Sequence, residues 1–335
     1  LMTNLTPPGR EFLRGLEQAG LIHDVLGGDP DASAVVDQAG AASLARGARS
    51  AEPPAAGPPG LLPPGTAVIS EASLEHPERN EDAYLHRDFR QGELQLRAVF
   101  DGIGGYVGGA QASHTAAQAL NRAMQAAMEG VGSDAITEEH LIAILASALR
   151  AADEAVQQLH RDRGLAQAGT TATVALVWRR PGGNRRVFVA QAGDSRAYLA
   201  DAQGTLTALT MDNLLARLRE HARVVTGAQG DTLVVDWEGA GEALLQLRRD
   251  SALLADVASA ADIDRANAWE AFYTRHLMGN ALGSRHQPHQ PVIFLATIPA
   301  NHPARIVVVS DGVSDNLTHR EMEAALRTAP AASEA

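Results

Sequence analysis

The chain contains no cysteine, and none of its 28 basic residues is a lysine. Without cysteine there can be no disulfide, no thiolate metal site and no cysteine nucleophile, so catalytic chemistry must come from other groups. The all-arginine composition, together with abundant alanine, is typical of a GC-rich bacterial genome. Selection of arginine for contacts with phosphate is the alternative interpretation.

Positive charge is also scarce relative to negative charge. Forty acidic residues give a formal net charge of −12 at pH 7, with a pI near 5.4. Nucleic-acid binding is therefore not expected, because contact with phosphates needs a basic face. No apolar run approaches the roughly 18 residues of a membrane span, and no signal-peptide pattern opens the chain. We expect no nucleic acid and no membrane among its partners, and a cytoplasmic location.

Composition divides the chain into three parts. Residues 1–48 carry short apolar patterns at helical spacing and are expected to form a helical or poorly ordered extension, or an adaptor for a partner. Residues 49–65 are rich in proline, glycine and alanine, which predicts a semi-extended linker. Residues 66–335 are expected to be the main domain.

Within the main domain, groups of strands flank two long helical stretches. Helices are expected at 110–129, 137–159, near 263–278, and at 318–327. Strands are expected at 67–74, 93–101, 171–178, 186–191, 197–200, 206–209 and 305–310. This order favours the α+β class over alternating α/β.

Two aspartates follow buried strands. The run 96–100 ends in Asp101-Gly102, and the run 305–309 leads through Ser310 to Asp311-Gly312. A carboxylate just past a strand end is held rigidly at a sheet edge, and glycine lets another group approach the backbone closely. Two such carboxylates that converge give an oxygen-rich site for a hard divalent cation. The alternative for each is an ordinary Asp-Gly turn.

Three further motifs accompany these two steps in a fixed order along the chain. They are Asn80-Glu81-Asp82, Gly169-Thr170-Thr171-Ala172 and Gly193-Asp194-Ser195-Arg196. The ordered set resembles the metal-dependent serine/threonine protein phosphatases, the PPM family of type 2C phosphatases, over roughly residues 66–325. The resemblance implies two packed antiparallel β-sheets flanked by helix pairs. It also implies hydrolysis of phosphoserine and phosphothreonine in proteins by a water activated by two cations.

The resemblance also implies a ligand set. Asp101 would bridge the two cations, while the Gly102 carbonyl and Glu81 would bind one of them. Asp311 would complete the other, so that Asp101, Asp311 and Glu81 form the catalytic set. Asp82 would be a ligand or the partner of a ligand.

A third, weaker metal site would involve Asp194 and Asp315. Oxygen-only ligands imply Mn²⁺ or Mg²⁺. The partners implied are phosphorylated proteins, in a signalling pathway that includes a Ser/Thr kinase. On their own, the residues leave simpler interpretations open: a solvated turn for Glu81 and Asp82, and a turn cap for Asp194.

Other motif residues are expected to have structural roles only. Thr170 and Thr171 should pack within a strand, without a catalytic role. The glycines before the helix at 110 should permit a tight loop, with a phosphate cradle as the alternative. His160 and His289 lack zinc-like spacing and are expected at surface or core positions.

Three departures from the family pattern affect these expectations. Pro77 stands where a phosphate-binding arginine is usual, which leaves Arg79 as the candidate phosphate ligand. Tyr106 replaces a histidine that is a proposed proton donor. No aspartate follows Asp315, although the family ends with an Asp-Asn motif and one more strand.

We therefore expect a domain that lacks its last strand and is incomplete at its C-terminus. The strand at 305–310 should then present an unpaired edge, and the second cation should bind weakly. The alternative function is a phosphatase-like binding or regulatory module with incomplete metal ligation and little activity.

Overall fold

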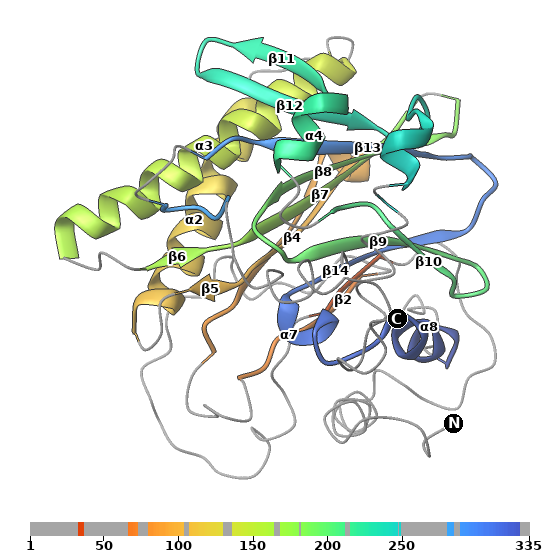
Figure 1. Ribbon diagram of the computed structural model, residues 1–335, viewed down its shortest axis with the longest axis horizontal. Helices are drawn as coiled ribbons and strands as arrows, with labels where there is room; N and C mark the ends of the chain where they lie inside the picture. Colours follow the sequence, from red (N-terminus) through yellow and green to blue (C-terminus); the bar gives the residue numbers. More distant parts are fainter. Residues whose placement is uncertain are drawn as a thin grey trace.

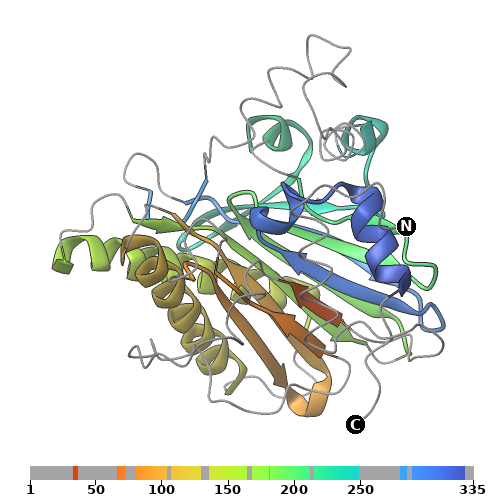
Figure 2. The same ribbon diagram turned by 90° about the horizontal axis from the view of Figure 1, so that it is seen from below.

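The computed structural model describes residues 33–36, 66–72, 80–103, 107–129, 136–163, 168–180, 182–211, 215–246, 248, 280–284 and 289–328. Its elements form four layers: a helix pair, a large sheet, a second sheet, and a C-terminal helix (Figures 1 and 2). The expected α+β class with two packed sheets is confirmed. The helix expected near 263–278 lies outside the described residues.

The large sheet has seven strands within the described part of the chain. Their spatial order is β11 Arg223–Gly227, β12 Gly230–Asp236, β13 Val292–Ile298, β8 Arg185–Ala192, β7 Ala172–Arg179, β4 Leu94–Phe100 and β3 Ala83–Phe89. All neighbours are antiparallel except β12 and β13. A 3₁₀ turn, Arg90–Gly92, joins β3 to β4.

The second sheet has five strands among the described residues. Their order is β10 Leu206–Ala208, β9 Arg196–Asp201, β14 Ala304–Val309, β1 Ser33–Val36 and β2 Thr66–Ile69. β1 runs parallel to both of its neighbours, and the other pairs are antiparallel. A separate two-stranded ribbon joins β5 Gly102–Ile103 to β6 Gly169–Thr170.

The described helices cover the outer faces of the sheets. α2 Val107–Glu129 and α3 Glu138–Arg163 pack on the seven-stranded sheet, and α8 His319–Thr328 packs on the five-stranded sheet (Figure 2). Two short helices, α4 Leu215–His221 and α7 Asp311–Ser314, lie in connections. Among the described residues, no helix combines the length and apolar character needed to cross a lipid bilayer.

The packing follows from the alternation of side chains along each strand. In β4, Leu96 and Ala98 face the core shared with α2 and α3, whereas Val99 faces the core between the sheets. On the far side, Val307 and Val309 of β14 pack with Met322 of α8. Because one residue of slip would invert these faces, the alternation fixes the register of the strands that carry the site.

One expectation about sheet edges is wrong. The strand at 304–309 is not an unpaired edge, because β14 is hydrogen-bonded to β9 on one side and to β1 on the other. The residues that cover it come from Ser33–Val36, inside the expected N-terminal extension. The strand expected at 67–74 is also shorter than predicted, since β2 ends at Ile69.

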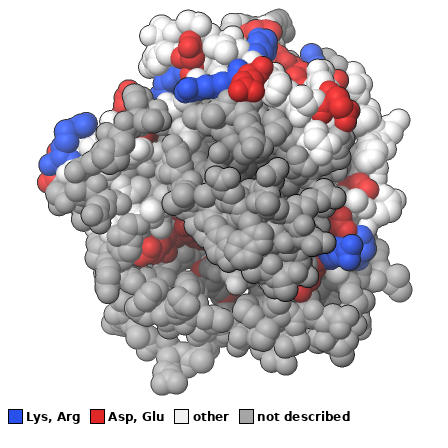
Figure 3. Space-filling view, viewed as in Figure 1, with Lys and Arg blue, Asp and Glu red and all other residues white. Residues whose placement is uncertain are grey.

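The visible charges agree with the acidic composition. On the face drawn in Figure 3, arginine and acidic side chains are interspersed over the region of β11 and β12. The described part of that face shows no continuous basic patch of the kind that phosphate backbones require.

Candidate active site

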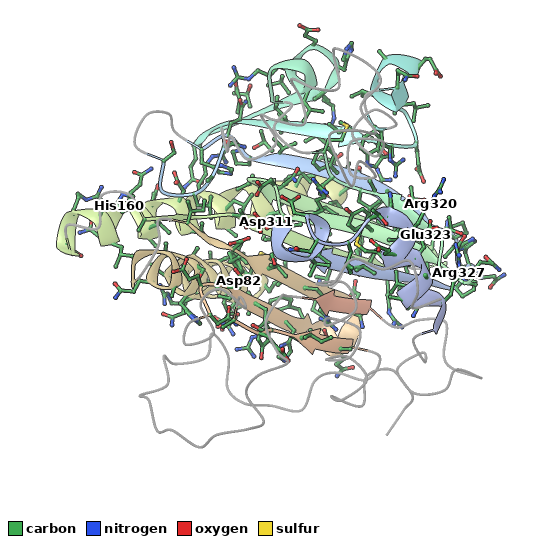
Figure 4. The ribbon with its side chains drawn as sticks, turned by 60° about the horizontal axis from the view of Figure 1, so that its bottom comes forward. Asp82, His160, Asp311, Arg320, Glu323 and Arg327 are labelled. Carbon is green, nitrogen blue, oxygen red and sulfur yellow. The ribbon has the colours of Figure 1, made fainter. Side chains whose placement is uncertain are left out.

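Three aspartates from three separate segments meet at one end of the two sheets. Asp82 precedes β3, Asp101 follows β4, and Asp311 opens α7 after β14. β3 and β4 are paired so that Ala83 lies opposite Phe100, which brings Asp82 beside Asp101. The Asp82 and Asp311 carboxyls lie close enough to that of Asp101 for both to raise its pKa. Figure 4 shows Asp82 and Asp311 at this common edge.

This convergence changes the electrostatics of Asp101. Burial raises the pKa of the Asp101 carboxyl well above its usual value, and the neighbouring charges of Asp82 and Asp311 raise that pKa further. Negative charges placed this close together repel one another, which is the physical cause of the charge effect on Asp101. A bound cation would offset the same repulsion.

The donor set fits a hard divalent cation. The described residues contain no group of three or more carboxylate or imidazole side chains already arranged around a common point for a metal ion. Asp82 and Asp311 instead flank Asp101 closely enough to raise its pKa. A cation can offset the charge of such carboxylates, and an all-oxygen set suits Mn²⁺ or Mg²⁺.

Glu81 and Gly102 lie together against the first turn of α2. A Cβ atom on Gly102 would collide with the Glu81 carbonyl oxygen and would lie 2.5 Å from the Gly109 carbonyl oxygen. Glu81 Oε2 would lie 2.9 Å from a Cβ on Gly109. Ser113 Oγ donates a 2.6 Å hydrogen bond to the Glu81 carbonyl. Two glycines thus permit the close approach that places Glu81 next to the Asp101–Gly102 step.

The backbone of Asp101 is fixed by two threonines. The Asp101 N–H donates to Thr171 Oγ1 at 2.9 Å, and the Asp101 carbonyl accepts from the Thr171 N–H and from Thr170 Oγ1, both at 2.8 Å. Thr171 Oγ1 also shares a 2.7 Å hydrogen bond with Ser195 Oγ. The expectation that these threonines only pack within a strand is therefore incomplete, because they also hold Asp101.

Asp82 has its own supporting contacts, which the sequence did not single out. Asn80 Oδ1 accepts the Asp82 N–H at 2.9 Å, and Asn80 Nδ2 donates to Ser70 Oγ at 2.8 Å. Ser310 Oγ donates to Asp82 Oδ2 at 3.2 Å, which links the segment before β3 to the segment before Asp311. The available signal was the position of Asn80 and Ser310 immediately beside the predicted ligands.

The remaining predicted ligands occupy different surroundings. Asp194 is buried in the turn between β8 and β9, where Gly193 adopts a φ of +87° against Thr171. Asp315 follows Asp311 by one helical turn and has an exposed side chain. Neither residue is among the groups that raise the pKa of Asp101. Arg79, Pro77 and Tyr106 lie outside the described residues.

The comparisons with known proteins agree with this fold. Residues 72–333 match the family model described as protein phosphatase 2C. No match was found among curated protein sequences.

Solved structures similar to this chain include serine/threonine phosphatases from bacteria. The phosphatase from S. agalactiae is 18% identical, with a TM-score of 0.46, and the match covers 77% of this chain and 82% of that one. PstP/Ppp from Mycobacterium tuberculosis is 23% identical, with a TM-score of 0.43 and coverage of 78% and 89%. MsPP from Mycobacterium smegmatis is 22% identical, with a TM-score of 0.38 and coverage of 76% and 89%. Because the family model spans most of its length, the chain belongs to the protein phosphatase 2C family.

Proposed function

We propose that this chain hydrolyses phosphoserine and phosphothreonine in proteins with the help of two divalent cations held by its aspartate cluster. Membership of the protein phosphatase 2C family supports the reaction class. The single observation that carries the metal-dependent part is the convergence of Asp82, Asp101 and Asp311, from three separate segments, at one end of the two sheets. A fold does not retain clustered carboxylates for stability, since their mutual repulsion opposes folding.

The proposed ligands follow the sequence analysis. Asp101, Asp311, Glu81 and the Gly102 carbonyl would together hold two Mn²⁺ or Mg²⁺ ions, with Asp101 as the central ligand. Asp82 would bind directly or support a ligand. When bound, the cations would lower the pKa of a water molecule, orient it towards the phosphoester and offset charge on the phosphoryl oxygens.

A third, weaker ion at Asp194 and Asp315 remains part of this proposal. Asp194 is buried but Asp315 is exposed, so a cation held by this pair would be less enclosed than one held by Asp101.

The residues of this chain would contribute position and charge. Thr170 and Thr171 fix the Asp101 backbone, so that its carboxylate is held before substrate arrives. Ser310 donates to Asp82 and keeps that carboxylate oriented towards the same edge. Arg79 would bind the substrate phosphate in place of the arginine that Pro77 replaces.

The proposed biological setting is bacterial signalling in the cytoplasm, opposite a Ser/Thr kinase. The lysine-free, arginine-only composition supports the bacterial origin. The substrates would be phosphorylated proteins, and the acidic net charge of −12 supports the exclusion of nucleic acids.

Phosphate release from phosphopeptides tests the proposal. Phosphoserine, phosphothreonine and phosphotyrosine peptides would be compared with Mn²⁺, with Mg²⁺ and with a chelator. We expect turnover of the first two substrates only, and its loss on chelation with recovery when metal is restored. A folded protein that binds Mn²⁺ or phosphopeptide without turnover would favour the regulatory-module alternative instead.

A further inference from the structure

A buried carboxylate in the middle of α3 is not used by the aspartate cluster. Asp153 is 7% exposed and lies on the helix face that includes the core residues Leu149, Ala152 and Val156. A carboxylate in such surroundings destabilises the fold unless its oxygens accept hydrogen bonds. Burial raises the pKa of Asp153, and hydrogen bonds from its partners counter that rise.

The partners of Asp153 come mainly from one distant segment of the chain. Asp153 Oδ1 accepts the Gly283 N–H at 2.7 Å. Gln157 Nε2, one helical turn along α3, donates to Oδ2 at 2.9 Å. Both oxygens are thus occupied, and the backbone of His289 lies close enough to counter the rise in the pKa of Asp153.

The two described ends of residues 280–290 are tied together as well. Asn280 Nδ2 donates to the Gln290 carbonyl at 3.0 Å, and Asn280 Oδ1 accepts the Gln290 N–H at 3.1 Å. Gly283 has a φ of +83°, and a Cβ there would lie 2.5 Å from Val156 of α3. The segment therefore sits directly on the helix, in a conformation that suits glycine.

The same segment contacts the support of the aspartate cluster. Leu282 forms an antiparallel bridge with Thr170, with N–H to carbonyl distances of 2.9 and 3.2 Å. Thr170 pairs on its other side with Gly102 and donates through Oγ1 to the Asp101 carbonyl. In Figure 1 the short blue segment 280–284 lies between α3 and β6. Leu282 thus acts as a third strand beside the β5–β6 ribbon.

A second contact from α3 reinforces this arrangement. His160, labelled in Figure 4 near the end of the helix, hydrogen-bonds through Nε2 to the Ala168 carbonyl. Its ring lies 3.3 Å from the position that a Cβ of Gly283 would take. α3 therefore holds both residues 280–284 and the residue before β6, on either side of the Leu282–Thr170 bridge.

We propose that Asp153 is a positioning residue of the active site. It anchors residues 280–284 so that Leu282 holds Thr170, and through Thr170 the Asp101–Gly102 backbone, in the conformation that receives the cation. The inference rests on the proposed function for its metal-binding consequence, whereas its structural part concerns the Asp101 backbone alone. Asp153 does not touch substrate or cation and is not a catalytic residue.

The test compares Asp153→Ala with Leu149→Ala. Leu149 is fully buried one turn earlier on the same helix face, so its truncation destabilises the core without removing a hydrogen bond to residues 280–284. Mn²⁺ affinity would be measured by calorimetry. The rate of amide hydrogen exchange would be measured at Thr170, Thr171 and Leu282. Both variants would be studied well below their melting temperatures. Asp153→Asn keeps an acceptor for Gly283 and serves as the conservative variant.

We expect Asp153→Ala to weaken Mn²⁺ binding at least tenfold and to speed exchange at these amides at least tenfold. Leu149→Ala should change the Mn²⁺ affinity less than twofold. The loss of Mn²⁺ affinity in Asp153→Asn should lie between the losses in the two alanine variants. Equal effects of the two alanine variants, or none from Asp153→Ala, would overturn the inference. If the wild-type chain binds no Mn²⁺, the proposed function fails. In that case the positioning role is decided by hydrogen exchange at Thr171, whose N–H donates to the Asp101 carbonyl: faster exchange in Asp153→Ala supports it, and unchanged exchange overturns it.

Discussion

The hydroxyl oxygen of Thr171 accepts a hydrogen bond from the backbone N–H of Asp101 at 2.9 Å. Thr171 lies just before β7, and Asp101 just after β4, which is the neighbouring strand in the sheet. The contact ties the metal-binding aspartate of the proposed site to the adjacent strand at the point where both leave the sheet. The position of Asp101 is therefore set by the sheet rather than by a free loop.

Replacement of Thr171 by valine keeps the shape of the side chain and removes its hydrogen bonds to Asp101 and Ser195. We expect a loss of about 1–3 kcal/mol in the free energy of unfolding, because a buried N–H loses its acceptor. We also expect Mn²⁺ affinity to fall severalfold. Thr173→Val is the matched control, since buried Thr173 donates to the Ser195 carbonyl. Similar Mn²⁺ affinities in the two variants would contradict the role assigned to Thr171.

Gly102→Ala tests the close packing around the same step. The added methyl group would meet the Glu81 carbonyl and lie 2.5 Å from backbone atoms of Gly109, neither of which can move as a flexible side chain would. We expect destabilisation of about 1–3 kcal/mol from this overpacking, together with loss of Mn²⁺ binding. Gly239→Ala, where no atom lies within 4 Å of the new Cβ, should be close to neutral in both thermal unfolding and metal titration.

The sequence predicted the fold best where the signal is local. The strands 172–179 and 185–192 and the helices 107–129 and 138–163 were expected within a few residues, because continuous apolar runs and helical periodicity are local signals. The strands β11 and β12, which mix polar and apolar residues, were not assigned, and neither was β13, although its run VIFLATI is apolar. The pairing of β14 with β1 is a long-range contact with no local signal.

The site shows the same division between local and long-range information. Asp101 and Asp311 could be predicted as converging carboxylates, because each follows a strand end and belongs to an ordered set of motifs. Their approach to one another, and the contact of Ser310 with Asp82, needed the two sheets to be packed. The role of Asp153 could not be predicted, since its partner Gly283 is 130 residues away.

His289 predicts how stability depends on pH. Burial lowers the pKa of this histidine from 6.5 to about 4, and its Nε2 has no hydrogen-bond partner among the described residues. The unfolded chain therefore binds a proton that the folded chain does not bind between these pH values, so stability falls as pH drops from 6.5 towards 4. Below pH 4 the free energy of unfolding should be lower by about 3 kcal/mol, because folding lowers the pKa of His289 from 6.5 to about 4.

The check is denaturant unfolding of the wild type and of His289→Gln across this pH range. The difference in the free energy of unfolding between them should be constant above pH 7 and should shift in favour of the variant below pH 6. A difference that does not change with pH would mean that His289 is not held neutral in the folded protein.

Arg79→Ala tests the proposed phosphate contact. We expect the KM for a phosphothreonine peptide to rise about tenfold or more, since a charge-assisted contact with phosphate contributes on the order of 1.5–3 kcal/mol. Mn²⁺ affinity should change little. Arg122→Ala, which removes an exposed arginine of α2, is the control for a change in net charge alone. An unchanged KM in Arg79→Ala would mean that Arg79 does not contact the substrate phosphate.

Calorimetric titration of Mn²⁺ into the wild type and Asp101→Asn tests the proposed metal centre most directly. The variant keeps the size of the side chain and its hydrogen-bonding capacity, but removes the charge that would bridge the cations. We predict that the wild type binds Mn²⁺ tightly and that Asp101→Asn loses this tight binding, because affinity for hard cations follows ligand charge and number. Binding to Asp101→Asn within twofold of the wild type would contradict the assignment of Asp101 as the central metal ligand.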